Sequence, residues 1–292
     1  MIKLENTVLP SAEQWEAIIR GMRNPKNSWD RSDSVHCLVP ENGGEHPCSK
    51  CHLNGTAECH GCDPGDFVLG HNDHKLMMSL AKGGPVHAKY RRMIPVYVDI
   101  TAPLYWWKEF DTYKVGTVAN SCSTMHKIHA KEFTLEDFSC EHLIDGSDIV
   151  KDKELRENLD VLERKQLEGY ILVNGEHDLM PIESFNPESN QESVEWLSPV
   201  DILEMYVIGA LNFYRDKYLE TKDKKYWWQM IQLLPTSYNQ KRTVMLNYEV
   251  LHNIYISRKN HKLPEWHEMC AWIENLPYSE IITLEEVCED AD

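Results

Sequence analysis

The sequence predicts an α+β protein with an irregular, cysteine-rich segment near its beginning. Apolar stripes at helical spacing recur along both halves of the 292-residue chain. One short stretch alternates instead, with Ile94, Val96, Val98 and Ile100 at every second position, which is typical of a strand buried on one face. Residues 27–65 are rich in Gly, Pro, Asn and Cys and show little periodicity, so we expect an irregular excursion there.

Capping residues and turn residues predict where the elements begin and end. Ser11 and Gln14 have the spacing of a capping box at the start of a helix over 11–24. A second helix is predicted over 72–83, with Asn72 as its cap and Gly83 as its stop. Pro95 indicates either that this strand lies at the edge of its sheet or that the strand begins at Pro95. The other predicted elements are an aromatic helix at 102–110, a loop at 111–121, a surface helix within 145–170, a loop at 186–193, a long helix over 198–220, and helices at 224–234, 241–259 and 264–276.

The overall composition predicts a globular protein without a membrane-spanning segment. Hydrophobic residues make up 42% of the chain and charged residues 26%, an ordinary balance. The longest apolar runs are interrupted by charges, so no membrane span is predicted. The beginning "MIKLENTVLP" lacks the basic and apolar pattern of a secretory signal, and we expect a cytoplasmic protein.

The net charge of -17 argues against a nucleic-acid polymer as partner, because an acidic body repels phosphate chains. A single nucleotide in a local basic pocket remains compatible with this charge. Part of the acidic excess lies in the C-terminal "SEIITLEEVCEDAD", which is expected to be a solvated tail.

The stretch "CSKCHLNGTAECHGC" holds two Cys-x-x-Cys pairs: Cys48, Cys51, Cys59 and Cys62. Four thiolates at this spacing suit the tetrahedral corners of a zinc site. A closed four-sulfur site leaves no open coordination position, so the zinc would be structural. The alternatives are an iron–sulfur cluster, a zinc enzyme, four free thiols, or a site in which His46, His52 or His60 replaces one cysteine.

The predicted domain organisation follows from this segment. Residues 1–66 would form an N-terminal helix and the zinc-binding segment with its four cysteines. Residues 67–292 would form the α+β domain, with the polar, charge-mixed residues 145–196 as an insertion.

Basic residues that could form a phosphate pocket are scattered along the acidic chain. Lys and Arg neutralise phosphate oxygens, provided that the side chains converge. Solvated surface charge is the alternative for each of them. The series consists of His87, Lys89, Arg91, Arg92, Lys108, Lys114, Lys127, Arg242, Arg258 and Lys262.

A nucleophile-and-base pattern is also present in "CSTMHKIH", which holds Cys122, His126 and His129. A histidine four residues after a cysteine is common by chance. The aromatic runs "LYWW" and "YWWQM" could stack on a flavin or a base, or belong to the core.

Three motifs together resemble the flavin-dependent thymidylate synthase family, over residues 73–273 without 145–196. "DHKLMMSLAKGGPVHAKYRRMIPVYVDITAPLYWWKEF" is similar to the family's helix, His-containing turn, strand and aromatic helix. "DTYKVGTVANSCS" stands in the place of its signature, Arg-His-Arg, seven residues, Ser, any residue, Arg. "LLPTSYNQKRTVMLNYEVLHNIYISR" resembles its Leu-Pro, Asn and Arg series.

The resemblance implies a small sheet packed with long helices, and a protein that uses FAD and folate to methylate or otherwise modify dUMP or a related pyrimidine deoxynucleotide. It also implies a homotetramer with sites between subunits. It assigns catalysis to Arg258 and Ser121, cofactor binding to His87, Lys89, Asn247 and Thr112, and substrate binding to Lys108, Lys114, Ser123 and Arg258.

The signature itself is altered. Asp111, Thr112 and Tyr113 replace Arg-His-Arg, and Ser123 replaces the last arginine. Charge-assisted hydrogen bonds contribute about 1.5–3 kcal/mol each, so several kcal/mol of anion binding would be lost unless nearby lysines compensate. The alternative function is therefore a non-catalytic descendant of this fold that binds a nucleotide or a protein.

The zinc prediction is tested by metal analysis of the purified protein. We expect about one zinc per chain. Cys51→Ser together with Cys62→Ser should lose the metal and lower the melting temperature, because the metal replaces a core that the Gly-rich segment cannot build. A metal-free wild-type protein would contradict the prediction.

Overall fold

The computed structural model describes most of the chain, in four stretches. Two compact units make up the chain, and each is described by itself below. The predicted four-cysteine zinc site and the predicted surface helix within 145–170 lie outside the described residues, so both stay predictions. The predicted boundary between residues 66 and 67 falls at the edge of an undescribed stretch and stays a prediction too. The described stretches are residues 2–36, 67–144, 180–186 and 191–284.

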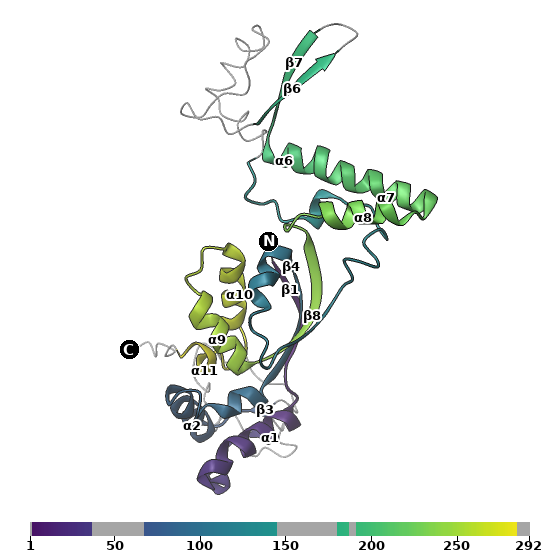
Figure 1. Ribbon diagram of the computed structural model, residues 1–292. Coiled ribbons are helices and arrows are strands. Elements are labelled where there is room, and N and C mark those ends of the chain that lie inside the picture. Colours follow the sequence, from purple (N-terminus) through teal and green to yellow (C-terminus); the bar gives the residue numbers. More distant parts are fainter. Residues whose placement is uncertain (1, 37–66, 145–179, 187–190, 285–292) are drawn as a thin grey trace, which may run out of the picture. The chain divides into compact units, whose positions relative to one another are not determined.

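The first unit is built on a four-stranded sheet with the order β1-β4-β8-β5 (Figure 1). β1 (Lys3–Val8) pairs antiparallel with β4 (Pro95–Pro103), and β5 (Val118–Ser121) pairs antiparallel with β8 (Asn239–Asn247). The central pair is antiparallel as well, because Tyr248 N donates to Ile94 O while Thr243 Oγ1 donates to Asp99 Oδ1. The small antiparallel sheet with its helices confirms the predicted α+β class.

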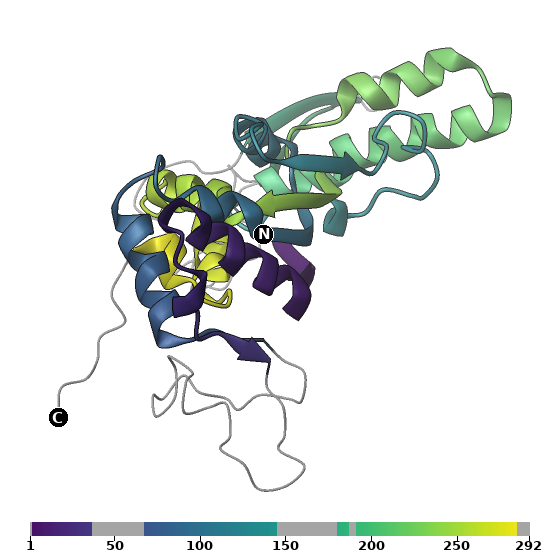
Figure 2. The same ribbon diagram turned by 90° about the horizontal axis from the view of Figure 1, so that it is seen from below.

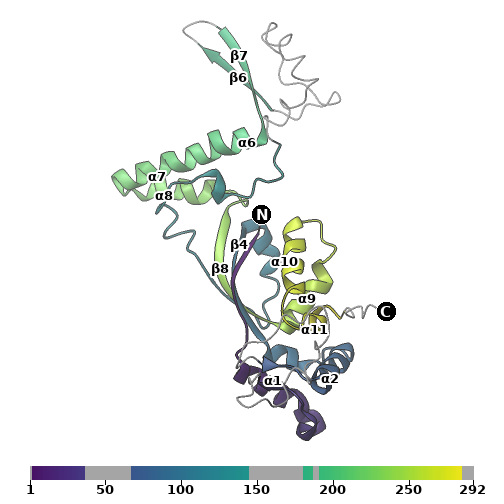
Figure 3. The ribbon, with the colours of Figure 1, turned by 180° about the vertical axis from the view of Figure 1, so that it is seen from behind.

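The core lies on one face of this sheet. The predicted alternation of β4 is confirmed, since Ile94, Val96, Val98 and Ile100 are all buried and the strand starts at Pro95. Helices α9 (Tyr248–Arg258) and α10 (Pro264–Glu274) lie together on one side of the strands (Figures 1 and 3). The predicted aromatic helix is α3 (Leu104–Phe110), which brings Trp106, Trp107 and Phe110 into the core beside Trp266 of α10.

Three strands differ from the expectations. The sequence does not predict β1, because it is an edge strand whose residues are mostly exposed and carry no alternation. β5 lies within the predicted loop 111–121, and it too is an exposed edge strand. The predicted helix 241–259 is wrong in its first part: residues up to Asn247 belong to β8, and Asn247 then caps α9 through Val250 N.

The C-terminal residues are not all a solvated tail. α11 (Glu280–Thr283) buries Ile281 and Ile282 completely. Arg91 of η4 (Lys89–Met93), a 3-10 helix, donates to Ile281 O and pairs with Glu249 of α9. This part of the acidic end is therefore a packed element, and the expectation of a tail is wrong for it.

The N-terminal helix α1 (Ala12–Arg23) begins with the predicted capping box of Ser11 and Gln14. α2 (His71–Lys82) follows the short pair β2 (Val35–His36) and β3 (Phe67–Val68), and Figure 2 shows it beside the C-terminal helices. Its predicted cap, Asn72, is wrong. The Asp33 carboxylate accepts from the backbone N–H groups of Asn72 and Asp73 instead.

Gly70, the residue before α2, is required by this cap. A Cβ at Gly70 would lie 2.2 Å from Asp33 Oδ1, which is closer than real Cβ atoms approach. The carboxylate can therefore reach the start of α2 because residue 70 has no side chain.

A buried ion pair ties α1 to α2. Arg23 Nε lies 2.5 Å from Asp73 Oδ1, and both side chains are almost fully buried. Asp73 Oδ2 accepts from Ser32 Oγ and Ser34 Oγ. Arg23 also donates to the carbonyls of Ser28 and Arg31. The pair thus fixes the whole turn between α1 and β2.

The pKa of Asp73 is set by the same contacts. Burial alone would raise the pKa of this carboxyl, but hydrogen bonds from Ser34 and Ser32 and the contact with Arg23 outweigh burial and lower it.

The second unit contains a long helix and a helical partner. Ser198 and Asp201 form a capping box, after which α6 (Pro199–Asp201), the π-helical η6 (Ile202–Ile208) and α7 (Gly209–Thr221) run on without a break. α8 (Lys224–Leu233) packs against α7. The predicted helix over 198–220 is confirmed, since Leu203 and Leu211 are buried in the core of this unit, with Val207 and Tyr214 packed against it.

A hairpin precedes this helix. β6 (Met180–Asn186) and β7 (Gln191–Leu197) pair antiparallel, with Met180 opposite Leu197. The predicted loop 186–193 is therefore wrong at Asn186 and from Gln191 on. None of the described helices combines the length and the apolar character that crossing a membrane requires.

Replacing Asp73 with asparagine tests the buried pair. The folded carboxyl keeps its charge to lower pH than the unfolded one, whose pKa is about 3.9, so its stabilisation is complete above about pH 5 and is lost as the pH falls through the lowered folded value. At pH 7 we expect Asp73→Asn to lower the free energy of unfolding by about 3–5 kcal/mol. Below about pH 4 the difference from the wild type should shrink.

Urea unfolding followed by circular dichroism at both pH values measures this change. The exposed Asp30→Asn is the control and should stay within about 0.5 kcal/mol of the wild type. A loss for Asp73→Asn that is equal at both pH values would contradict the assigned role of its charge.

Candidate functional site

The site that the sequence prediction favours is centred on Arg258, the last residue of α9. Arg258 Nη1 lies 2.7 Å from Glu109 Oε2, near the end of α3, and Arg258 Nε donates to the hydroxyl of Tyr113 at 3.0 Å. Its guanidinium carbon lies 4.8 Å from the ring centroid of Trp266. These three neighbours orient the Arg258 side chain. Because 19% of its surface remains exposed, a ligand can still reach it.

The carboxylate of Glu109 contacts three other side chains of this cluster. Its Oε2 atom accepts from Trp266 Nε1 at 3.1 Å and lies 3.3 Å from His261 Nε2, in addition to the contact with Arg258. Among the contacts that the structure describes, Arg258 uses two of the five N–H groups of a guanidinium. The remaining donors can serve a ligand, and "Arg258 cluster" below means Glu109, Tyr113, Arg258, His261 and Trp266.

A second arginine is held beside the altered signature. Arg242 Nη1 lies 2.7 Å from Asp111 Oδ1, and its guanidinium carbon lies 4.0 Å from the ring centroid of Trp107. Ser121 is paired with Arg242 in the register of β5 and β8. The structure therefore places Ser121 next to Arg242, and Arg242 in turn contacts residue 111 of the signature.

The loop within the signature stretch is held against the start of α9. Asn247 Oδ1 accepts from Val250 N at 3.0 Å, and its Nδ2 donates to Gly116 O at 3.3 Å. Gly116 has a φ of 82°, and a Cβ there would lie 2.6 Å from Asn247 Nδ2. Residue 116 must therefore be glycine for the loop to keep this contact.

The remaining predicted ligands near α3 differ in their contacts. Thr112 Oγ1 donates to Glu109 O at 2.7 Å, so its hydroxyl proton is already used. Lys108 and Lys114 are both exposed and stand next in sequence to Glu109 and Tyr113.

Electrostatics around the Arg258 cluster favour an anion, although the whole chain carries a net charge of -17. Cations outnumber carboxylates along α3, the signature and the two arginines. The cations are Lys108, Lys114, Arg242 and Arg258, and the carboxylates are Glu109 and Asp111.

His87 and Lys89 lie away from Arg258 within one chain. Both are exposed, with His87 two residues before η4 and Lys89 its first residue. Arg91 of η4 pairs with Glu249 in the first turn of α9. Arg258 is at the other end of this helix, nine residues on, which is about 13 Å at 1.5 Å per residue. Arg91 itself is fully buried and is not available to a ligand.

Ser123 belongs to the second unit, where its Oγ accepts from His126 N at 2.9 Å. Cys122 and His126 are exposed. Burial lowers the pKa of His129, and the neighbouring Lys222, Lys127 and Arg215 lower it further. The His129 ring packs edge-on against Tyr218 at 4.9 Å, an arrangement typical of a packed histidine.

The residues of one chain do not fit the pyrophosphate of FAD at the altered signature. Asp111 adds a negative charge there, and the side chains of Asn247 and Thr112 are engaged in the contacts described above. His87 and Lys89 lie toward the other end of α9. Within the described residues no group of three or more His, Cys, Asp or Glu side chains could hold a metal ion.

Sequence reasoning missed the residues that orient Arg258. Glu109, His261 and Trp266 were not assigned to the site, because Glu109 and Arg258 are 149 residues apart in the chain. The one available signal was the position of Glu109 on the same predicted aromatic helix as Lys108.

No protein-family model matches the chain, and no curated protein sequence matches it. Among solved structures, the chain is similar to thymidylate synthase X (ThyX) from Helicobacter pylori with FAD and dUMP, at 14% identity, with 97% of this chain and 96% of that chain covered and a TM-score of 0.48. A second structure of the same Helicobacter pylori protein with FAD and dUMP matches at 14% identity, with 97% of each chain covered and a TM-score of 0.46. Likenesses of this size fix neither the ligands nor the chemistry of this chain.

A double-mutant cycle tests the link between α3 and α9. Glu109→Gln and Arg258→Gln should each destabilise the fold, and together they should show a coupling energy of about 1–2 kcal/mol, because each leaves the other charge without its partner. The exposed pair Lys217 and Glu220 on α7 is the matched control, with an expected coupling below about 0.5 kcal/mol. Equal coupling in both pairs would show that Glu109 does not orient Arg258.

Proposed function

We propose that this chain binds a pyrimidine deoxynucleotide at the Arg258 cluster. The observation that carries the proposal is the state of Arg258: its guanidinium is oriented by Glu109, Tyr113 and Trp266 and remains partly exposed, with further N–H groups for a ligand. The resemblance to flavin-dependent thymidylate synthases, which assigns the pyrimidine base to Arg258, supports the same ligand class.

The arrangement offers different chemistry to the two parts of a nucleotide. A planar guanidinium held in one orientation can donate two hydrogen bonds to the carbonyl edge of a pyrimidine. Lys108 and Lys114 are exposed, flexible point charges that suit a phosphate monoester. Glu109 also supplies a reason for specificity, because a ligand carboxylate at Arg258 would meet like charge.

Binding without catalysis is the form of this proposal that the signature residues favour. Asp111 and Tyr113, which replace signature arginines, make internal contacts to Arg242 and Arg258. Asp111 offers no hydrogen-bond donor to a flavin pyrophosphate, and Tyr113 offers a single hydroxyl where an arginine would offer five N–H groups. The proposal therefore corresponds to the predicted non-catalytic descendant of the fold in the form that binds a nucleotide. The other predicted form of this descendant binds a protein partner.

The second candidate is the complete reaction, in which FAD and folate serve to methylate dUMP. It is favoured by the exposure of His87 and Lys89, which could meet the signature of a neighbouring copy in a homotetramer. Such an assembly would supply the cations that one chain lacks beside Asp111. The two candidates share the nucleotide and differ in turnover.

Calorimetric titration with dUMP tests the shared part. We expect binding at micromolar to submillimolar dUMP, and Arg258→Ala should weaken it at least about tenfold, as expected for a lost charge-assisted hydrogen bond. Lys108→Gln with Lys114→Gln should weaken binding by a similar factor and leave the fold intact, because both side chains are exposed. Lys217→Gln on α7 is the matched control.

Release of tritium from 5-tritiated dUMP with folate and a reductant separates the candidates. We expect no release, and a colourless purified protein. Release that Arg258→Ala abolishes would establish the second candidate. Absence of binding by dUMP, dTMP and dCMP at about 1 mM would refute both.

A further inference from the structure

Two adjoining cavities lie in the first unit, on either side of the turn between α1 and β2. The larger holds about 720 Å³ and opens between this turn and α2. The smaller holds about 290 Å³ and lies between α1, the same turn and β3. Arg23 lines both cavities, and its contacts with Asp73, Ser28 and Arg31 hold the shared wall in place. Neither cavity includes a residue of the Arg258 cluster.

The larger cavity is basic in an acidic protein. Lys26, Arg31 and Lys75 line it together with one carboxylate, Asp30. All three cations are exposed, and no carboxylate of the described residues forms an ion pair with them. Amide and hydroxyl groups complete the lining, among them Asn27. Three such cations with neutral donors between them suit a chain of two or three phosphates better than a single one.

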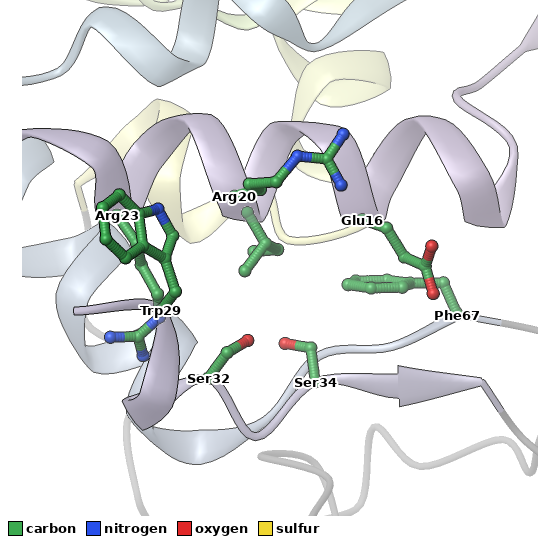
Figure 4. A pocket seen from close by; sticks show the side chains of 8 residues that line it. Glu16, Arg20, Arg23, Trp29, Ser32, Ser34 and Phe67 are labelled. Atoms are coloured by element: carbon green, nitrogen blue, oxygen red, sulfur yellow. The ribbon is translucent and has the colours of Figure 1, made fainter. Parts of the chain in front are cut away.

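The smaller cavity has the character of a site for a flat ring. Figure 4 shows Trp29 and Phe67 at its two ends, with Glu16 and Arg20 of α1 along one side and Ser32 and Ser34 along the other. Trp29 is 50% exposed although it is a large aromatic side chain, and its indole Nε1 donates to Asn24 Oδ1 at 2.8 Å. This hydrogen bond fixes the ring while leaving a face open, which is how aromatic side chains stack on bases.

The two cavities meet at η2 (Trp29–Arg31), a single turn of 3-10 helix. Its first residue, Trp29, lines the smaller cavity, and its next two, Asp30 and Arg31, line the larger one. A ligand that bridges η2 would therefore present a flat ring to Trp29 and anionic groups to Arg31. We infer that the turn between α1 and α2 is a second, separate nucleotide site, which binds a nucleoside di- or triphosphate with its base against Trp29 and its phosphates among Lys26, Arg31 and Lys75.

Charge and ring contribute through different residues, so they can be tested separately. Arg31→Gln with Lys75→Gln removes two cations and should keep the fold, since Arg23 contacts only the backbone carbonyl of Arg31 and Lys75 is exposed on α2. Trp29→Ala removes the ring, and Trp29→Phe keeps a flat ring as its conservative counterpart. Lys217→Gln on α7 again serves as the control for a lost surface charge.

The experiment titrates the full-length protein with UTP, ATP, a nucleoside monophosphate and inorganic tripolyphosphate by calorimetry. We expect the triphosphates to bind, and Arg31→Gln/Lys75→Gln to weaken them at least about tenfold, with tighter binding at low salt. Trp29→Ala should weaken nucleoside triphosphates about tenfold and leave tripolyphosphate unchanged, while Trp29→Phe should recover most of the loss.

Three results would overturn the inference. The first is no binding of any triphosphate at about 1 mM. The second is equal affinity of the wild type and Arg31→Gln/Lys75→Gln. The third is equal affinity of nucleoside triphosphates and tripolyphosphate together with no effect of Trp29→Ala, which would leave an inorganic polyanion site only.

The same variants separate this site from the proposed function. Arg31→Gln/Lys75→Gln should bind dUMP as the wild type does, and Arg258→Ala should bind ATP, which has no pyrimidine base, as the wild type does. Loss of both ligands in either variant would mean one shared site and would contradict a second one.

Discussion

The antiparallel pairing of β4 with β8 decides which residues of this protein can meet. α3 follows the end of β4, and α9 follows the end of β8. Because the two strands run in opposite directions, α9 starts beside the beginning of β4, where Tyr248 N donates to Ile94 O. It then runs back over about 16 Å, at 1.5 Å for each of its 11 residues, so its last residue reaches α3. The pairing of Arg258 with Glu109 is a direct result.

The same constraint accounts for the position of the His87 turn. Residues that precede β4 must lie near the start of α9, and the pair Arg91–Glu249 holds them there. No local rearrangement of a side chain brings His87 to Arg258 across the length of a helix. A reaction that needs both would need two chains, whereas binding at the Arg258 cluster needs one.

Helices and the central strand could be predicted because their signals are local. The capping box at Ser11 and the alternation in β4 depend on residues within a few positions of each other. The misses share the opposite property. The cap of α2 comes from Asp33, and α11 accepts a hydrogen bond from Arg91, which lies 190 residues away in the chain.

The roles that the resemblance assigns to the site residues stay predictions, and the structure shows only where these residues lie. Thr112 donates to the carbonyl of Glu109, whose carboxylate contacts Arg258, whereas Asn247 caps the opposite end of α9. The resemblance could not reveal that Asp111 contacts Arg242 and that Tyr113 contacts Arg258. A substituted motif residue shows which contact of the family is missing, but it does not show which new contact the substituting residue makes. The roles of His261 and Trp266 depend on the fold bringing α10 beside α3.

The pairing of β2 with β3 has a consequence for how this chain tolerates change. Val35 lies opposite Val68 and His36 opposite Phe67, so the two residues that flank the stretch 37–66 are neighbours in the sheet. A stretch whose two ends are adjacent can be gained, exchanged or deleted in a single genetic event while the scaffold around it keeps its geometry. Residues 37–66, with their two Cys-x-x-Cys pairs, have such adjacent ends, and a short turn joining His36 to Phe67 would close β2 and β3 into a plain hairpin.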